Sequence, residues 1–436
     1  MLYGFGANEY EVLKSSESLL LEFRNNINTN DDLFELTPLT LPSCNFQIRK
    51  IVANNEFATA MLTMDGKLFG SGKNVASMFG FNNEKYPSIK PFTWIGNGLQ
   101  GLAIKNVAIG NRFILAQTLL GQLFVCGSFI GSSPLMECEV FTNLDPYVPT
   151  KLKNAGIEYI HARYTHCGVI SRDGSLYVIG ENGCGEFGLG HYFDRNKFTL
   201  VSSIPESVKS INFGYHNSVA IGESGFIYVA GSNLNGELGI SNEEDSTVKV
   251  FRKIEIMNSE NIEKIQKTAC GMHHVLVLSE RGHIYSTGAN DFGQLGLNDF
   301  YNRYEFSIVM PQTTFRDVSC GDHFSVMMTL DGQILACGSN SNGAIGQWIH
   351  HNPISPTPIL VDGQQLIASA KHQNQQPTSL VCGNRFTLCY HSAECFMDII
   401  LKEKQHMLQC LFEQLQQHQN MTTHLSPEIT FHFSTR

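Results

Sequence analysis

A glycine-centred frame recurs along most of the sequence and dictates how the chain can fold. Each copy has an apolar segment, a turn glycine, an apolar residue two positions later and a second glycine six positions later. Successive turn glycines lie 50 to 57 residues apart: Gly66, Gly121, Gly174, Gly225, Gly282 and Gly332. The second glycines are Gly72, Gly127, Gly180, Gly231, Gly288 and Gly338. Self-similarity at such a period indicates stacked copies of one supersecondary unit.

Each copy predicts a small antiparallel sheet. The segments around the turn glycine are apolar, β-branched or aromatic, and a two-residue hairpin turn needs the positive φ that glycine adopts without strain. Eleven residues before the turn lies a further marker: Gly110, Gly214, Gly271 and Gly321, with Asn55 and Arg163 in the weaker copies. A sheet this small has too little core to stand alone and must stack on its neighbours.

The two ends of the repeat region complement each other. A seventh marker, Gly383, has no turn glycine after it, whereas residues 1–6 match the strand that follows a turn. The sequence therefore predicts an all-β fold, a seven-bladed β-propeller whose last blade is closed by the N-terminal strand, which removes exposed edges.

The unit 270–296, with its Cys-Gly-x-His-His start and Gly-Gln-Leu-Gly end, resembles the regulator of chromosome condensation repeat. The resemblance covers residues 1–7 and about 46–390, and it implies the same propeller fold. It also implies two classes of function. One is a protein-interaction platform, and the other is guanine-nucleotide exchange on a small GTPase, as performed by the family's exchange factor for Ran.

The resemblance places candidate partner-binding residues in the short loops after the first strand of each blade. The family's acidic positions fall on Asn111 and Thr165, and its histidine pair falls on His273 and His274, with His166 at a related position. Loss of both carboxylates argues against authentic Ran exchange. The alternative for the histidines is a structural role, in which the ring nitrogens bond neighbouring backbone.

The unit after Gly127 departs most from the template, because residues 130–137, after Ser128 and Phe129, replace the usual Asn and Gly-x-Leu-Gly turn. In the family's exchange factor this blade carries a protruding wedge, and an ordinary variable loop is the alternative. The predicted partner-binding set comprises Asn111, Phe129, Ile130, Ser132, Ser133, Glu137, Thr165, His166, His273 and His274.

The sequence contains no recognisable site for covalent catalysis. The segment 183–188 matches G-x-G-x-x-G after a strand, but no βαβ unit follows, which argues against a dinucleotide site. Of the 12 cysteines, Cys126, Cys270, Cys320, Cys337 and Cys382 directly precede repeat glycines, and none shows C-x-x-C spacing. We therefore expect reduced core thiols, no metal site and no cofactor.

Charge and hydropathy indicate which classes of partner and which cellular compartment to expect. The 30 basic and 40 acidic residues give a net charge of −10, which argues against nucleic acid or chromatin as the partner. The sequence shows neither an apolar run of spanning length nor a secretory signal, so we expect an intracellular protein of the cytoplasm or nucleus.

Two domains are expected. Residues 1–391 form the propeller, with a long insertion at 8–45, and residues 392–436 form a helical tail with a short strand-like end. That end, residues 427–433, weakly resembles the opening strand of a BTB domain. The expected state is a monomer, with association through the tail as an alternative.

The function that these observations favour is a non-catalytic interaction propeller that docks a partner protein through loops on one face, as an adaptor or small-GTPase regulator. The alternative is a guanine-nucleotide exchange factor for a Ran-like or other small GTPase. The partner's identity stays open.

Overall fold

The computed structural model describes residues 2–6, 33–38, 47–54, 58–99, 101–129, 136–241, 246–258, 261–347, 354–361 and 377–390. The chain separates into two units, Met1–Ser392 and Ala393–Arg436. The second unit, which contains the predicted helical tail, lies outside the described residues.

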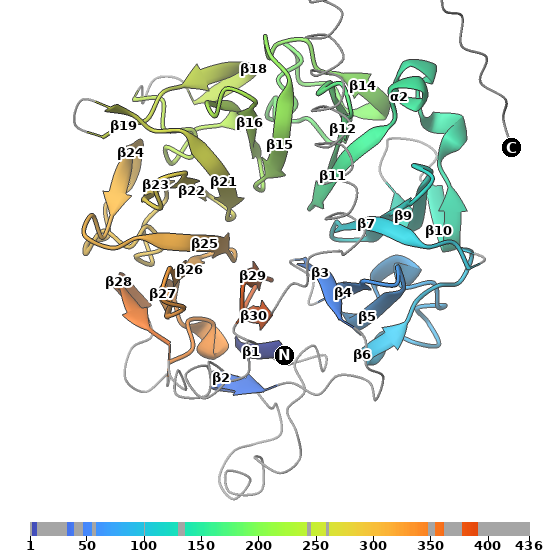
Figure 1. Cartoon of the computed structure of the whole chain (residues 1–436), viewed down its shortest axis with the longest axis horizontal. Coiled ribbons are helices and arrows are strands. Elements are labelled where there is room, and N and C mark those ends of the chain that lie inside the picture. Colours follow the sequence, from blue (N-terminus) through green and yellow to red (C-terminus); the bar gives the residue numbers. More distant parts are fainter. Residues whose placement is uncertain are drawn as a thin grey trace, which may run out of the picture. The chain divides into compact units, whose positions relative to one another are not determined.

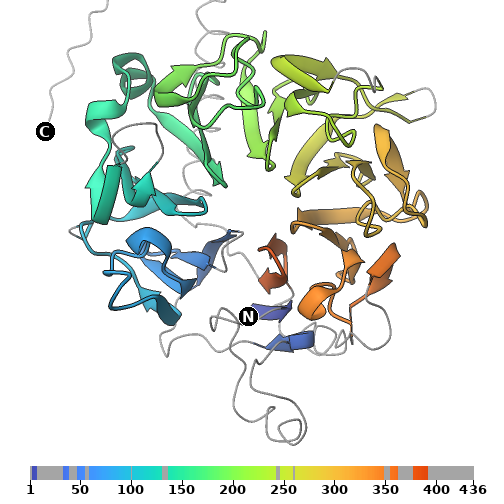
Figure 2. The same ribbon diagram turned by 180° about the vertical axis from the view of Figure 1, so that it is seen from behind.

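The first unit is a ring of four-stranded antiparallel sheets around a central axis (Figures 1 and 2). Six of the sheets are each built from four consecutive strands, and a seventh joins strands from both ends of the unit.

The first three consecutive sheets contain these strands: β3 (Ile48–Ala53), β4 (Ala58–Thr63), β5 (Leu68–Lys73) and β6 (Ser88–Trp94); β7 (Ile104–Ile109), β8 (Phe113–Thr118), β9 (Leu123–Phe129) and β10 (Met136–Asn143); β11 (Ile157–Arg163), β12 (His166–Ser171), β13 (Leu176–Gly180) and β14 (Arg195–Leu200). The next three contain these: β15 (Val208–Phe213), β16 (Asn217–Gly222), β17 (Ile227–Ser232) and β18 (Thr247–Ile254); β21 (Ile265–Cys270), β22 (His274–Ser279), β23 (Ile284–Gly288) and β24 (Arg303–Val309); β25 (Phe315–Cys320), β26 (Phe324–Thr329), β27 (Ile334–Ser339) and β28 (Ile354–Leu360).

The smaller elements are a two-stranded ribbon and a few short helical segments. The ribbon pairs β19 (Met257–Asn258) with β20 (Asn261–Ile262). The helical segments are α2 (Thr150–Ala155) and the 3-10 turns η1 (Val75–Ser77), η2 (Asp145–Tyr147) and η3 (Ser341–Gly343). The all-β propeller class predicted from the sequence is confirmed.

The first strand of each sheet lies nearest the central axis of the ring. Consecutive inner strands contact one another around the ring, and β29 (Ser379–Cys382) contacts β3, which closes the circle. Most residues of the outermost strands are exposed or half-buried, as in β14, whereas second strands such as β22 are buried along their whole length. The reason is that the middle of each sheet is covered on both faces by its neighbours.

The core lies between adjacent sheets. Val178 and Phe187 from one sheet pack with Phe213 and Ala220 from the next in a single buried cluster. Each sheet contributes to the interface on both sides, so no sheet buries its apolar faces without its neighbours.

The hairpin turns are one residue longer than predicted. In the loop that joins β22 to β23, the Ser279 carbonyl accepts the N–H of Gly282, and Ser279 N–H donates to the His283 carbonyl. The loop therefore has three residues and ends in Gly282 at φ +84°. This is the three-residue hairpin with its last residue in the left-handed region, so the glycine is required at the third position.

The second repeat glycine has a different cause. Gly231 has φ +109°, and a Cβ there would collide with the carbonyl oxygen of His216. That carbonyl accepts the N–H of Ser232 at 2.7 Å, which ties the loop after β15 to the end of β17.

The predicted completion of the last sheet by the N-terminal strand is confirmed. In that sheet β1 (Leu2–Gly6) lies between β30 (Phe386–Tyr390) and β2 (Leu33–Pro38), with Leu2 opposite Tyr390 and Gly6 opposite Phe386. Treating all of residues 8–45 as an insertion was wrong, because residues 33–38 form the outer strand β2. The proline at its end is compatible with an edge strand, which needs fewer backbone donors.

Candidate functional site

The candidate site lies at the end of the ring that we call the loop face. It carries the loops after each inner strand, such as 164–165, 214–216, 271–273 and 321–323, and the loops after each third strand, such as 181–194 and 289–302. Both sets lie at one end because strands two and three are antiparallel, with His166 opposite Gly180. The turns that contain Gly121 and Gly332 lie at the other end.

Backbone hydrogen bonds link the inner loops of successive sheets around the ring axis. Asn111 N–H donates to the Tyr164 carbonyl at 2.8 Å, and Met272 N–H donates to the Asp322 carbonyl at 3.1 Å. In the weakest repeat a side chain takes this role, because the amide of the buried Asn54 donates to the Gly110 carbonyl at 2.8 Å. The inner loops are therefore fixed relative to one another.

Arg163 reaches across the ring axis to two distant sheets. Its Nη1 donates to the carbonyl oxygen of Cys270 at 2.5 Å, and its Nη2 lies 3.8 Å from the carboxylate of Asp322. The Tyr164 hydroxyl donates to the same carboxylate at 3.0 Å. Burial raises the pKa of Asp322, and the charge of Arg163 opposes that rise. The sequence showed Arg163 only as an irregular marker, and nothing near it in sequence indicates a contact with residues over 100 positions away.

Two of the predicted partner-binding histidines are interior residues. The His166 ring contacts the carbonyls of Glu181 and Tyr215 at 3.1 and 3.0 Å. His274 is fully buried, its Nε2 lies 3.0 Å from the Ser325 hydroxyl, and burial lowers its pKa to about 3. Both rings sit inside the structure, so neither meets a partner directly. Their alternative structural role fits the observed contacts, although the Nδ1 of His274 has no partner among the described residues.

The neighbouring inner-loop histidines face buried carboxylates of the preceding sheet. His216 Nδ1 lies 3.4 Å from Glu186, and His273 Nδ1 lies 3.3 Å from Glu237. Both carboxylates are almost fully buried, and each also accepts a backbone N–H two residues earlier in its own turn, from Cys184 and Asn235. The same geometry thus occurs twice at interfaces between sheets.

The structure brings Asn111, Thr165 and His273 to the loop face, where each is partly exposed. Thr165 donates to the carboxylate of Glu181 at 2.9 Å. Since Asn111 and Thr165 are neutral, an acidic side chain at this part of the face comes from Glu181 instead, which sequence comparison position by position did not reveal.

Strands β9 and β10, on either side of the segment that departs from the repeat template, pair as a hairpin. Phe129 at the end of β9 pairs with Met136 at the start of β10, and the Phe129 side chain is buried against Phe113. Glu137 is exposed and lines a groove of about 400 Å³ together with Arg112. The predicted residues Ile130, Ser132 and Ser133 lie outside the described residues.

Exposed aromatic and apolar side chains from three consecutive sheets also lie on the loop face. Phe193, Leu234 and Tyr301 are 73%, 67% and 76% exposed, and each lies in the loop between the third and fourth strands of its sheet. Two further aromatic residues of this face, Tyr215 and Phe292, are each 37% exposed. The prediction of partner-binding residues from the family's inner loops does not include this set, although the segments 191–195 and 299–303 share aromatic and arginine residues.

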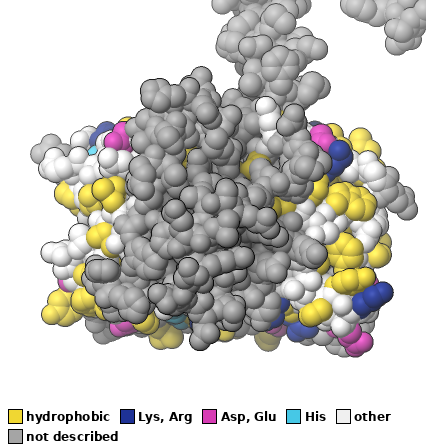
Figure 3. Space-filling view, turned by 90° about the horizontal axis from the view of Figure 1, so that it is seen from below, with side chains coloured by type: hydrophobic (Ala, Val, Ile, Leu, Met, Phe, Trp, Pro, Cys, Tyr) yellow, Lys and Arg dark blue, Asp and Glu magenta, His cyan; other side chains and the backbone are white. Residues whose placement is uncertain are grey.

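The outer wall, the cysteines and the helices complete the description of the first unit. In the edge-on view the described outer wall mixes hydrophobic, polar and charged side chains beside the grey atoms (Figure 3). Nine cysteines are described as free thiols, and eight of them are buried, including all five predicted core thiols. Within the residues described, no helix has the length and apolar character needed to cross a bilayer.

Known proteins share the repeats and the fold. Residues 265–294 and 315–344 match the family model for the regulator of chromosome condensation (RCC1) repeat, and a second model with that description matches residues 281–328. The ultraviolet-B receptor UVR8 of Arabidopsis thaliana is 30% identical over 234 residues, which is 51% of this chain and 50% of the receptor. The X-linked retinitis pigmentosa GTPase regulator of Homo sapiens is 32% identical over 138 residues, which is 31% of this chain and 13% of the regulator.

Among solved structures, Prp20p from Saccharomyces cerevisiae, described with its binding to Gsp1p and histones, aligns with a TM-score of 0.70 and 17% identity over 93% of this chain and 94% of that chain. That likeness shows the fold alone. The sheets, inner strands and loop face define a repeat-built β-propeller. The chain is a propeller that carries RCC1 repeats within residues 265–344, and it spans half the length or less of the two curated relatives named above.

Proposed function

We propose that this propeller is a non-catalytic docking protein that binds a partner protein through its loop face, as an adaptor or small-GTPase regulator. The observation that carries the proposal is the set of exposed apolar side chains Phe193, Leu234 and Tyr301, held on three consecutive sheets of a rigid ring. Aromatic side chains are enriched at protein interfaces because they bury a large area at a low cost in conformational entropy.

The architecture favours a macromolecular partner over a small ligand. Arg163 and the hydrogen bonds among the inner loops link residues across the ring axis, and the exposed apolar side chains are spread over three sheets of the loop face. The net charge of −10 favours a protein over nucleic acid. Unpaired buried thiols support an intracellular compartment, where thiols stay reduced.

Within the predicted set, we propose that Asn111, Thr165, His273 and Glu137 face the partner, and that Phe129, His166 and His274 hold the loops in place. This division follows from burial, because a side chain needs exposed surface to contribute contact area. One of the relatives named above is called a GTPase regulator, and this supports a small GTPase as one class of partner.

Affinity capture with matched surface variants tests the proposal. One variant carries Phe193→Ser, Leu234→Ser and Tyr301→Ser on the loop face. Its control carries Leu120→Ser and Leu330→Ser, two exposed apolar residues in turns at the opposite end. We expect the wild type and the control to recover the same proteins. The loop-face variant should recover at least about tenfold less of them, because a few anchor residues supply most of the binding energy of an interface. Equal losses in both variants would refute docking through the loop face.

The dependence of binding on nucleotide distinguishes the alternative function, guanine-nucleotide exchange, from that of an adaptor. An exchange factor binds the nucleotide-free GTPase more tightly and thereby weakens nucleotide binding by the same factor. Two results together would establish exchange. A small GTPase would be recovered preferentially after EDTA strips its nucleotide, and it would release a fluorescent GDP analogue faster in the presence of the propeller. Recovery that is indifferent to EDTA is the result expected of an adaptor.

A further inference from the structure

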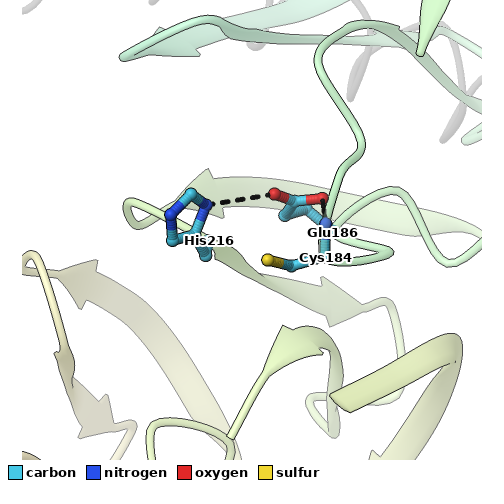
Figure 4. A group of neighbouring side chains, drawn as sticks. All are labelled: Cys184, Glu186 and His216. Carbon is cyan, nitrogen blue, oxygen red and sulfur yellow. Dashed lines mark hydrogen bonds and ion pairs between the residues drawn. The ribbon is translucent and has the colours of Figure 1, made fainter. Parts of the chain in front are cut away.

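Three chemically distinct side chains meet at the interface between the sheet β11–β14 and the sheet β15–β18. Cys184 and Glu186 lie in the turn after β13, and His216 lies in the loop after β15. Each offers one ligand atom, and these atoms all lie within 4.8 Å of one another. Figure 4 shows the sulfur of Cys184 directed toward the space beside the His216–Glu186 contact.

We propose that Cys184, Glu186 and His216 bind a divalent metal ion of the zinc class. Thiolate, imidazole and carboxylate are the ligands that Zn²⁺ prefers, and three such ligands leave a fourth position for water. Zinc–ligand distances of 2.0–2.3 Å place two ligand atoms of a tetrahedral site about 3.4–3.6 Å apart. His216 Nδ1 and Glu186 are already 3.4 Å apart, so binding requires only a small approach of the sulfur.

The surroundings hold the ligands in place. Glu186 is 1% exposed, and one carboxylate oxygen accepts the Cys184 N–H at 3.0 Å, which orients the other toward His216. Ser218 donates a hydrogen bond to the Glu186 carbonyl. Within the described part of the chain, the Cys184 sulfur has no hydrogen-bond partner, and Cys184 is the one free thiol there that is not buried. Its partial exposure gives a metal ion access from the loop face.

The next interface supplies an internal comparison. Glu237 and His273 repeat the carboxylate–imidazole contact at 3.3 Å, but Asn235 stands where the first site has Cys184, and its amide donates to Glu237 at 3.0 Å. The pair alone is thus a structural contact between sheets, and the thiol distinguishes the proposed metal site. The sequence did not indicate it because the ligands come from two loops 30 residues apart, without C-x-x-C spacing.

Zinc and cobalt titrations of the purified full chain test the site. The variants are Cys184→Ser and His216→Gln, and the matched control is His273→Gln. Removing an outer-shell group typically weakens metal binding 10–100-fold, so we expect loss of a direct ligand to raise the Zn²⁺ Kd at least about 100-fold. Both variants should also lose the near-ultraviolet thiolate-to-Co²⁺ absorption, while His273→Gln keeps it.

Thermal melts in EDTA verify that every variant folds. The proposal is overturned if the wild type binds Zn²⁺ no more tightly than Cys184→Ser, or if His273→Gln weakens binding as much as His216→Gln. These readouts do not depend on partner docking, so they stand whether or not the proposed function holds.

Discussion

Arg163 stabilises the ring by bridging residues that are distant in sequence. We expect Arg163→Met to lower the free energy of unfolding by about 2 kcal/mol, because the bonds it loses include contacts to carbonyls and to a carboxylate with little exposure. Chemical denaturation measures the change, and Arg112→Met, at an exposed position, is the control.

Asp322 gives that prediction a pH signature. Its pKa is raised in the folded state, so its contribution to stability is greatest below the unfolded value and is lost as pH rises through the folded value. Without Arg163 the folded pKa rises further, so the deficit of Arg163→Met should shrink on acidification. Adding Asp322→Asn to the Arg163→Met variant should recover part of the lost stability at neutral pH. Two fully additive losses would show that the residues act independently.

The fully buried His274 predicts acid sensitivity of the opposite sign. Its pKa falls from 6.5 to about 3 on folding, so its contribution is intact above 6.5 and is lost as pH falls toward 3. Between about pH 7.5 and about pH 5.0 this amounts to about 2 kcal/mol. Denaturation of His274→Gln should show a pH dependence shallower by that amount, and an unchanged slope would contradict a neutral buried imidazole.

At the scale of the elements, the two classes of repeat glycine should differ in tolerance. Gly121 has φ +85° with open space where a Cβ would lie, so Gly121→Ala should cost only the backbone strain of about 1–2 kcal/mol. Gly231→Ala adds a collision with the His216 carbonyl, which overpacking data suggest costs about 1–3 kcal/mol more. Equal unfolding free energies for the two variants would remove the steric explanation of the second glycine.

The success of sequence reasoning at this scale follows from local causes. Positive φ at Gly282 and the carbonyl contact at Gly231 recur in the repeats, so the pattern itself predicts the sheets. The strand β2 was missed because six alternating residues inside a polar stretch are a weak signal. Arg163 with Asp322, and Cys184 with His216, were missed because only the closed fold brings them together.

For the whole molecule, completion of the last sheet depends on β1. Deleting residues 2–6 removes the strand between β30 and β2 and leaves both edges unpaired. With about 1 kcal/mol per net hydrogen bond, the two lost ladders should cost about 4 kcal/mol or more. A synthetic peptide with the sequence of residues 1–7, added in trans, should recover part of the lost melting temperature. A deleted chain that melts like the full chain would show that the ring does not need this strand.

The most direct measurement of docking is amide hydrogen exchange of the propeller with and without the protein recovered by affinity capture. Our account predicts added protection in the loops around Thr165, His273, Phe193 and Tyr301, and none in the turns around Gly121 and Gly332 at the opposite end. Protection confined to those opposite turns, with the loop face unchanged, would contradict the central claim.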